Sequence, residues 1–480
     1  MPRIAPVADS PPPAILVMRR GSWGLSRASI LASSASPQGW LDAELAAAGR
    51  PDPVDDGLVT RFPVLASTTS DFIARSKAAN RAGNGDQMQA LNRLCVARAI
   101  WSPRQLLERM VDFWSNHLNV TCPSDRVWAS RADYDATVVR ANALSSFREL
   151  LRAALHHPAM LMYLNNDVSS KTQPNENLGR ELLELHTVGV EAGYTETDVL
   201  NSARILTGMS RDWTTSAYLY RPSWHWTGPV QVLDFSDPNR SSDGQAVVTA
   251  YLDHLARHPA TARRLATKLC QYFVADTPPS TLVERMAAVY LRNDTAIVPV
   301  LREMFLSSEF AASADQKVRR PAEQLYAAVR ALGIQLPPTG TEGIETLHWA
   351  VQDMAEEPNA WPTPDGYPTS ADEWRSAGAM LARTNAVTTL AHGWWKGLVY
   401  PPITDLLPRP LSKTHGGLIS ALYQRLHFRK MPSADLSAVC GYLGVRWSDP
   451  VTAKSAVRNP AWDLPQLVGV LLNAPALAIY

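Results

Sequence analysis

The chain has 480 residues, of which 46% are hydrophobic, so it can bury a sizeable core and is neither a disordered nor a fibrous protein. Its 46 basic and 45 acidic residues nearly cancel, which leaves no long-range field to attract nucleic acid or an anionic membrane. We therefore expect a small-molecule substrate, with a protein partner as the second candidate and with neither nucleic acid nor a membrane as a partner.

The beginning of the chain does not have the order of a secretory signal, because a basic pair at 19–20 follows the short apolar patch at 14–18. No stretch reaches the roughly 18 consecutive apolar residues that a membrane-spanning helix requires. The four cysteines are far apart and lack CxxC spacing, so we expect buried thiols. These observations predict a cytoplasmic protein.

Signals for helix starts and ends recur along the chain, whereas alternating strand patterns are almost absent. The predicted fold is mostly α, a multi-helix globular bundle in two closely packed lobes with long ordered loops. We expect an N-terminal tail and helical region at 1–100, a central helical core with the main motif at 101–335, and a C-terminal helical region at 336–480.

The first strongly amphipathic helix is predicted at 104–120, where the large apolar residues share one face. Asn175 can cap a second helix that runs to about residue 188, and Gly189 is placed to end it. Thr195 and Asp198 have the spacing of a capping box, which predicts that the next helix begins there. Further helices are expected at 259–274, 281–291, 295–306 and 321–333.

Two segments are predicted to be irregular because they are rich in Trp, Pro, Gly and Asp. The segment at 210–243 is typical of a long ordered loop or a short hairpin, and the segment at 357–376 is typical of a loop. Long irregular segments in a compact helical protein often carry function. Both are therefore candidate walls of a binding site.

The helix after Asn175 separates into two sides on a wheel of 100° per residue. The polar side carries Asn177, Arg180, Glu181 and Glu184, and the leucines occupy the opposite side together with His186. One interpretation is a solvent-facing ladder of ion pairs. The other is a site in which Glu181 and Glu184 act as acid and base, or bind a cation, while Arg180 and Asn177 orient them or the substrate.

Three histidines are further candidates for a site. His117 and His186 are placed on the apolar sides of their helices, so each is either an ordinary core residue or a metal ligand. His225 lies in a loop between Trp224 and Trp226, and aromatic residues in loops suggest a substrate-binding wall. The sequence does not show whether any of these side chains meet.

Several blocks of the sequence resemble the bacterial family known as domain of unknown function 1800. The blocks are FWSNH at 113–117, PAML at 158–161, YLNN at 163–166, NEN at 175–177, RELLELHT at 180–187, HPATA at 258–262, KVRRP at 317–321 and PDGYP at 364–368. The resemblance implies a mostly helical fold and favours a polar helix face that lines a cavity. Many members look exported and are encoded near sulfatase-like proteins, whereas the start of this chain does not predict an export signal. Many relatives also have an acidic residue where this chain has Trp226.

Three functions remain open at the level of sequence. The leading hypothesis is an enzyme with a carboxylate site at Glu181, Glu184 and Arg180 that acts on a small molecule, and that has a divalent metal as candidate cofactor. The second is a non-catalytic binding or assembly subunit that partners another protein. The third is an oxidoreductase that uses haem or iron, with haem as the weaker cofactor candidate.

Overall fold

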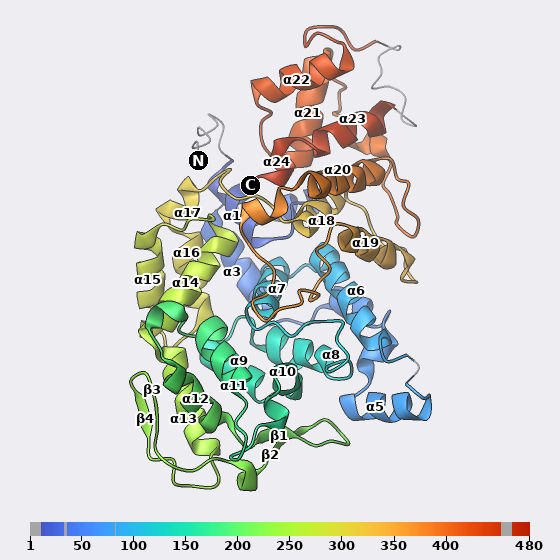
Figure 1. Cartoon of the computed structure of the whole chain (residues 1–480). Coiled ribbons are helices and arrows are strands. Elements are labelled where there is room, and N and C mark those ends of the chain that lie inside the picture. Colours follow the sequence, from blue (N-terminus) through green and yellow to red (C-terminus); the bar gives the residue numbers. More distant parts are fainter. Residues whose placement is uncertain (1–10, 33–35, 82, 453–462) are drawn as a thin grey trace.

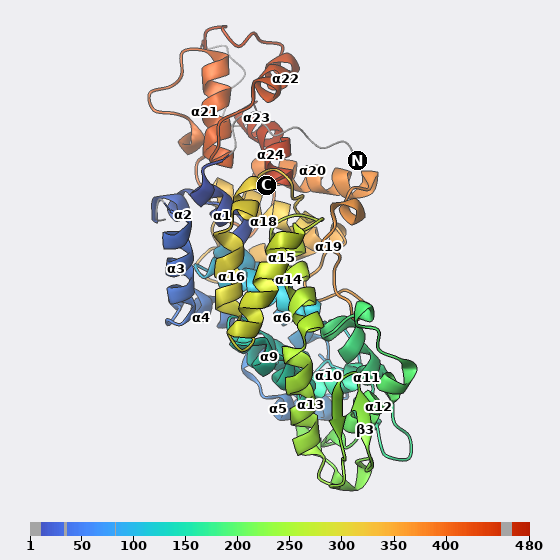
Figure 2. The same cartoon turned by 90° about the vertical axis from the view of Figure 1, so that its left-hand side faces the viewer.

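The computed structural model describes residues 11–32, 36–81, 83–452 and 463–480, and most of these residues form helices (Figure 1). The helices pack around two large hydrophobic cores, which define the first lobe and the second lobe. Two views at right angles show an elongated molecule, with α21–α23 at one end and the short strands at the other (Figures 1 and 2). The mostly helical, globular fold predicted from the sequence is confirmed.

The first lobe contains the helices that surround the larger core. They are α1 (Pro13–Gly21), α3 (Pro37–Ala48), α7 (Gln105–His117), α9 (Phe147–Leu155), α10 (Pro158–Tyr163), α11 (Glu176–Glu181), α12 (Glu196–Leu206), α13 (Gln245–Arg257), α14 (Pro259–Phe273), α15 (Ser280–Arg292), α16 (Ile297–Phe305) and α17 (Ser308–Ala312). Two π-helical segments also belong to this lobe, Tyr134–Arg140 after α8 (Arg131–Asp133), and Leu182–His186 after α11.

The second lobe forms around the other large core. Its helices are α18 (Pro321–Leu332), α19 (Glu342–Asp353), α20 (Ala377–Ala391), α21 (His415–His427), α22 (Ser433–Leu443), α23 (Asp463–Leu472) and α24 (Pro475–Ala478). The long helix α6 (Asp86–Trp101) contributes residues to this core and to a smaller one that it shares with α4 (Pro53–Val59). Helices α2 (Arg27–Ala32) and α5 (Thr69–Ala78) complete the set.

The two cores do not follow the order of the chain. The first takes residues from Leu16 to Leu41 and from Leu106 to Phe310, whereas the second combines Trp23 and the end of α6 with residues from Ala322 to Leu477. Each lobe therefore contains residues from more than one of the three regions expected from the sequence. The N-terminal region in particular supplies side chains to both cores.

The predicted helix boundaries rest on local chemistry that the structure confirms. The Thr195 hydroxyl accepts the Asp198 backbone N–H, and the Asp198 carboxylate accepts the Thr195 N–H, which completes a capping box. Pro259 and Pro321 occupy the first turns of α14 and α18, where a missing N–H costs no hydrogen bond. Gly333 ends α18 in the left-handed conformation.

The segment at 210–243 contains two short antiparallel hairpins rather than a continuous loop. Strand β1 (Met209–Arg211) pairs with β2 (Tyr218–Tyr220), and β3 (Val230–Val232) pairs with β4 (Phe235–Asp237). β3 packs against α12, and β4 contacts α13. Within the described ranges, no helix is both long enough and apolar enough to cross a membrane.

Candidate functional site

His117 and His186 lie side by side, although 69 residues separate them in the chain. The His117 Nε2–H donates to the His186 carbonyl, and the His186 Nδ1–H donates to the His117 carbonyl, both at 3.0 Å. Because carbonyls only accept, these bonds fix one tautomer for each ring. The His117 Nδ1 is then an acceptor, and the His186 Nε2 is buried without a hydrogen-bond partner in the structure.

Both imidazoles are held neutral by their surroundings. Burial lowers the pKa of His186 to about 3, and the neighbouring cations Lys268 and Arg264 act in the same direction. Burial also lowers the pKa of His117 well below its usual value, with Lys268 as the next cause. Two neutral rings can therefore accept hydrogen bonds from the cations beside them.

Lys268 and Arg264 come from α14 and are one helical turn apart. The Lys268 Nζ lies 3.4 Å from the His117 Nδ1, and this is its only hydrogen-bond partner among the described residues. Burial lowers the pKa of the Lys268 amine to about 8, and Arg264 lowers it further while Asp365 opposes the shift. The Arg264 Nε donates to the Leu185 carbonyl at 3.3 Å. An amine with this pKa has a useful neutral fraction near neutral pH.

Carboxylates face these cations from two directions. Burial raises the pKa of Glu181, and the charges of Glu184 and Asp365 raise it further, whereas Arg180 lowers it. The Tyr194 hydroxyl donates to a Glu184 carboxylate oxygen at 3.2 Å. Burial lowers the pKa of Arg264, and the charges of Glu191 and Glu184 oppose this shift. We call the seven residues His117, Glu181, Glu184, His186, Arg264, Lys268 and Asp365 the Lys268 cluster.

A loop from the second half of the chain brings Asp365 to this place. The Asn119 side chain donates to the carbonyls of Trp361 and Thr363, at 3.0 and 2.7 Å, and the Tyr367 N–H donates to the Asn116 side chain at 3.0 Å. The Trp361 indole N–H donates to Asp365 at 2.9 Å. This loop is the irregular segment predicted at 357–376 to form a wall of a site, and it lies against the end of α7.

The helix after Asn175 changes from α-helical to π-helical geometry in the turn that carries His186. The α-helical part ends at Glu181, and Leu182–His186 forms a π-helical turn. The Thr187 hydroxyl donates to the Leu182 carbonyl at 2.5 Å, and the Gly189 N–H donates to the Leu183 carbonyl at 2.8 Å. A wheel of 100° per residue no longer applies beyond Glu181. Arg264 of α14 donates to the Leu185 carbonyl, and its charge acts on His186 while that of Glu184 acts on Arg264.

Arg180 takes part in surface ion pairs. Its guanidinium bonds to Glu196 on α12 at 2.6 and 2.9 Å and lies 3.5 Å from Glu176. The side chain of Arg180 is 36% exposed and that of Glu196 is 78% exposed. The solvent-facing ladder considered from the sequence thus describes Arg180 and Glu176, whereas Glu181 and Glu184 lie partly buried beside α14. Asn177 is also partly buried, and its backbone N–H is capped by Asn175.

His225 occupies a different place, between the hairpins and α12. Its ring is buried and contacts the Thr207 carbonyl at 3.0 Å and the Asn239 side chain at 2.9 Å. Trp226 packs against the Arg204 guanidinium, and Trp224 against that of Arg221. No hydrogen bond in the described part of the chain joins these three residues to the Lys268 cluster. They hold the loop together by their own contacts.

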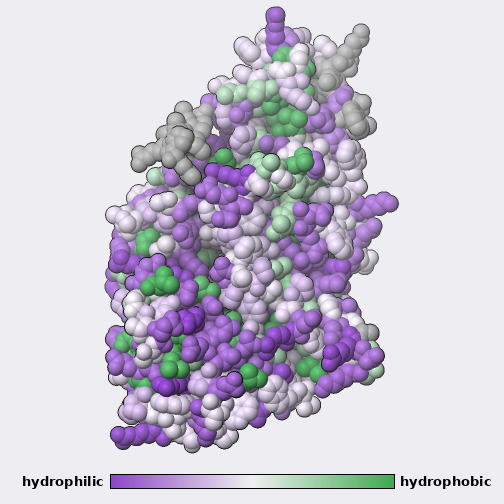
Figure 3. All heavy atoms as spheres, in the orientation of Figure 1, coloured by the Kyte–Doolittle hydropathy of each residue, from purple (hydrophilic) through white to green (hydrophobic). Residues whose placement is uncertain are grey.

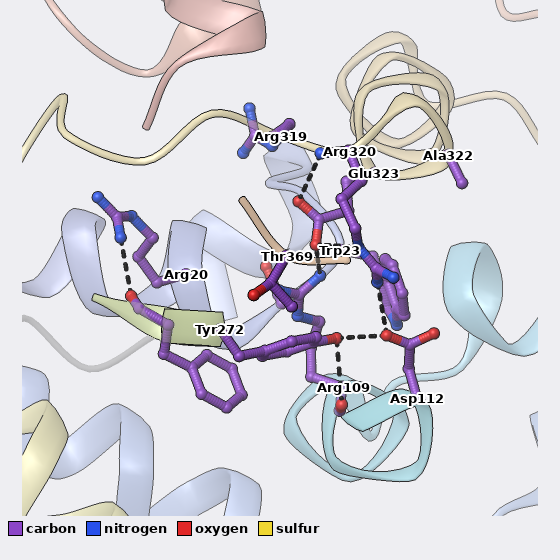
Figure 4. A network of polar contacts seen from close by, with 12 residues as sticks. Arg20, Trp23, Arg109, Asp112, Tyr272, Arg319, Arg320, Ala322, Glu323 and Thr369 are labelled. Carbon is purple, nitrogen blue, oxygen red and sulfur yellow. Dashed lines mark hydrogen bonds and ion pairs between the residues drawn. The ribbon is translucent and has the colours of Figure 1, made fainter. Parts of the chain in front are cut away.

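A second group of charges lies directly beside the Lys268 cluster, on the same helices. Tyr272 on α14 donates to Asp112 on α7 at 2.6 Å, and Arg320 bonds to the same carboxylate at 2.5 Å (Figure 4). Arg109 pairs with Glu323 at 2.5 Å. Burial raises the pKa of nearby Glu356 to about 7, although Arg320 opposes the shift. These groups, which we call the arginine network, largely satisfy one another and link the two lobes.

The sequence did not identify Lys268, Arg264 or Asp365 as site residues, although Asp365 lies in one of the blocks that carry the family resemblance. One available signal is the spacing of Arg264, Lys268 and Tyr272 at i, i+4 and i+8, which makes a polar stripe along a helix with an otherwise apolar inner side. The position of Asp365 depends on how a loop docks on α7. No local pattern encodes that contact.

The arrangement does not gather a ligand set for a metal. In the ranges that the structure describes, no three His, Cys, Asp or Glu side chains converge as a metal site requires. Both nitrogens of His117 are engaged, and only the Nε2 of His186 is without a partner. The four cysteines are free thiols, three of them buried.

Comparison with known proteins agrees with the blocks described above. No curated protein and no solved structure matches the chain significantly. One family model matches residues 16–479, a range that includes both the Lys268 cluster and the arginine network. The chain therefore belongs to the family described as "Protein of unknown function (DUF1800)".

Proposed function

We propose that the protein is an enzyme that moves a proton on a small polar substrate at the Lys268 cluster. Lys268 is the base, Glu181 and Glu184 are the carboxylates that bind the substrate or exchange protons with it, and Arg264 binds an anionic group. The observation that carries the proposal is the amine of Lys268. This amine is largely enclosed, has no carboxylate within bonding distance among the described residues, and contacts a neutral imidazole.

A lysine with a structural role normally has an ion pair. Lys317, on the segment before α18, shows this arrangement in the same protein, because its amine bonds to Asp276 at 2.5 Å and also to the Thr369 carbonyl. A buried cation without such a partner costs stability. Groups that are kept despite this cost are commonly functional. The contrast between Lys268 and Lys317 therefore favours a chemical role for Lys268.

The neighbours of Lys268 suit proton transfer. His117 accepts a hydrogen bond from the amine through Nδ1, while its Nε2–H is held by the His186 carbonyl, so the ring orients Lys268 without competing for its proton. Glu181 has a raised pKa and is thus a carboxyl that can take up a proton near neutral pH more readily than an exposed glutamate. The charge of Asp365 acts on both Lys268 and Glu181, which supports their assignment as the base and the acid of the proposed reaction.

The decisive experiment compares Lys268→Met with Lys317→Met by urea unfolding. We expect Lys268→Met to leave the free energy of unfolding unchanged or to raise it, because the change removes an unpaired cation. Lys317→Met should lower it by about 1–3 kcal/mol, because it leaves Asp276 without its partner. If both variants lose the same stability, Lys268 is a structural residue and the proposed role is wrong.

Two further variants distinguish an enzyme from an assembly subunit. Glu181→Gln and Glu184→Gln should keep the melting temperature of the parent, and acetic anhydride should modify Lys268 with a midpoint at about pH 8 in the parent and in both variants, because Arg264 and Asp365 are the charges that act on this amine. In an assembly subunit the same carboxylates would make structural bonds. Both variants would then melt at a lower temperature than the parent.

A further inference from the structure

A large cavity lies between the two lobes, away from the Lys268 cluster. Its volume is about 1140 Å³, slightly above the usual range of small-molecule sites, which is roughly 300–1,000 Å³. Its walls come from α1, α2 and α3 on one side and from α18, α20 and α21 on the other. Most of the lining is apolar, and the larger side chains are Leu25, Trp40, Trp101, Leu332, Leu390 and Leu406.

One wall of this cavity is apolar, and in the described part of the chain it is not covered by other residues. Helix α2 has no buried residue, although it carries Ala28, Ile30 and Leu31. Leu31 lines the cavity and is 76% exposed. Exposed apolar side chains in a concave surface lose contact with water when a ligand with an apolar body enters.

Two arginines give the cavity a positive charge. Arg27 of α2 and Arg425 of α21 both line it, and neither side chain has a hydrogen bond or ion pair to another described residue. Each lies close enough to affect the other, because burial and the Arg27 charge lower the pKa of Arg425. Neither of the two carboxylates that line the cavity forms an ion pair with these arginines. Asp405 pairs with Arg409 at 3.1 Å, and Glu44 accepts the Leu106 backbone N–H at 2.9 Å.

We propose that this cavity binds an amphipathic small molecule, with an aliphatic chain along the apolar walls and a carboxylate head group at Arg27 and Arg425. The volume and the apolar lining suit the chain. Two guanidinium groups that have no partner among the described residues suit a carboxylate, which an arginine can bind through two parallel hydrogen bonds. The inference does not depend on the role of Lys268.

The test measures binding of dodecanoate by calorimetry, below its micellar concentration, with dodecyltrimethylammonium as a ligand that has the same chain and the opposite charge. Ala43→Trp places a large side chain in the cavity from α3, and Ala46→Trp is the matched control, because Ala46 is exposed on the same helix and does not line the cavity. Arg27→Gln together with Arg425→Gln removes the positive charge.

We expect dodecanoate to bind the parent and the Ala46→Trp variant equally, and to bind the Ala43→Trp variant at least tenfold more weakly. The double glutamine variant should lose about tenfold in affinity for dodecanoate and nothing for dodecyltrimethylammonium. The proposal is overturned if dodecanoate does not bind the parent, if Ala43→Trp binds it as tightly as the parent, or if the two amphiphiles bind the parent equally well.

Discussion

At the scale of single residues, the most informative contrast is between charged groups that have a partner and those that do not. Arg109, Arg320 and Lys317 are buried and paired, whereas Lys268 is enclosed and rests on a neutral ring. The sequence could identify Glu181 and Glu184 as candidates, because their spacing on one helix is visible. It could not identify the partners, because those depend on tertiary contacts of α14 and of the loop at 357–376.

The buried histidines predict a pH dependence of stability. The pKa of His186 is about 3 in the folded protein and about 6.5 in the unfolded chain, so the unfolded state binds more protons between these values. Stability is therefore full above about pH 6.5 and falls as the pH decreases toward 3, by about 1.4 kcal/mol per pH unit for one histidine. Urea unfolding at several pH values between 7 and 4 measures this slope.

The control is His186→Asn, whose side-chain amide can still donate to the His117 carbonyl but does not titrate. Its slope of stability against pH should be smaller than that of the parent by one proton. An unchanged slope would mean that His186 is protonated in the folded protein, and the tautomer assigned above would then be wrong.

At the scale of secondary structure elements, the sequence predicted what local chemistry determines. Capping residues and prolines placed the starts of α12, α14 and α18 correctly. The π-helical turn at Leu182–His186 was not predicted, because the packing that fixes it involves His117 from another helix. The surface ion pairs of Arg180 agree with one of the two interpretations that the sequence offered, whereas the contact between His186 and His117 is not visible in the sequence.

The docking of the loop on α7 depends on Gly366. This residue has a φ of +74°, and a Cβ there would lie 2.2 Å from the Asn116 carbonyl oxygen. Gly366→Ala should detach the loop and lower the free energy of unfolding by about 2 kcal/mol or more, because both the backbone conformation and the contact become unfavourable. Limited proteolysis within 357–376 and urea unfolding measure the two effects.

Gly340→Ala is the matched control. Gly340 also has a positive φ, +88°, but no atom lies within 4 Å of the position of its Cβ. Its cost should be limited to the backbone term, about 1 kcal/mol, with no new cleavage in the loop. Equal effects of the two substitutions would show that the Asn116 contact does not hold the loop in place.

At the scale of the whole molecule, the arginine network connects the lobes. Arg109 on α7 of the first lobe pairs with Glu323 on α18 of the second, and the Tyr480 hydroxyl donates to Glu323 at 2.9 Å. The network is polar and comes from distant parts of the chain, so patterns of apolar residues cannot reveal it. The sequence could predict two lobes, but not the charged contacts between them.

Glu323→Gln tests this connection. The change leaves Arg109 without a counter-charge, whereas Arg320 keeps Asp112 and Glu356, so we expect a loss of about 3–5 kcal/mol in the free energy of unfolding. Calorimetry should show a lower melting temperature, and the two lobes should begin to unfold separately. The control is Arg375→Gln, which removes an ion pair on the surface and should change the free energy of unfolding by about 0.5 kcal/mol at most. Gln324→Glu is not suitable, because Gln324 accepts a hydrogen bond from Arg383.

The cavity between the lobes has a consequence for how the protein responds to small molecules. Met18 and Leu25 of its wall belong to the first core, whereas Leu332 and Leu390 belong to the second. A molecule bound there contacts both lobes and stabilises their association. At a concentration one hundred times its dissociation constant, such a ligand adds about 2.7 kcal/mol to the stability of the folded protein. A higher melting temperature in the presence of the ligand would then show that the cavity is occupied.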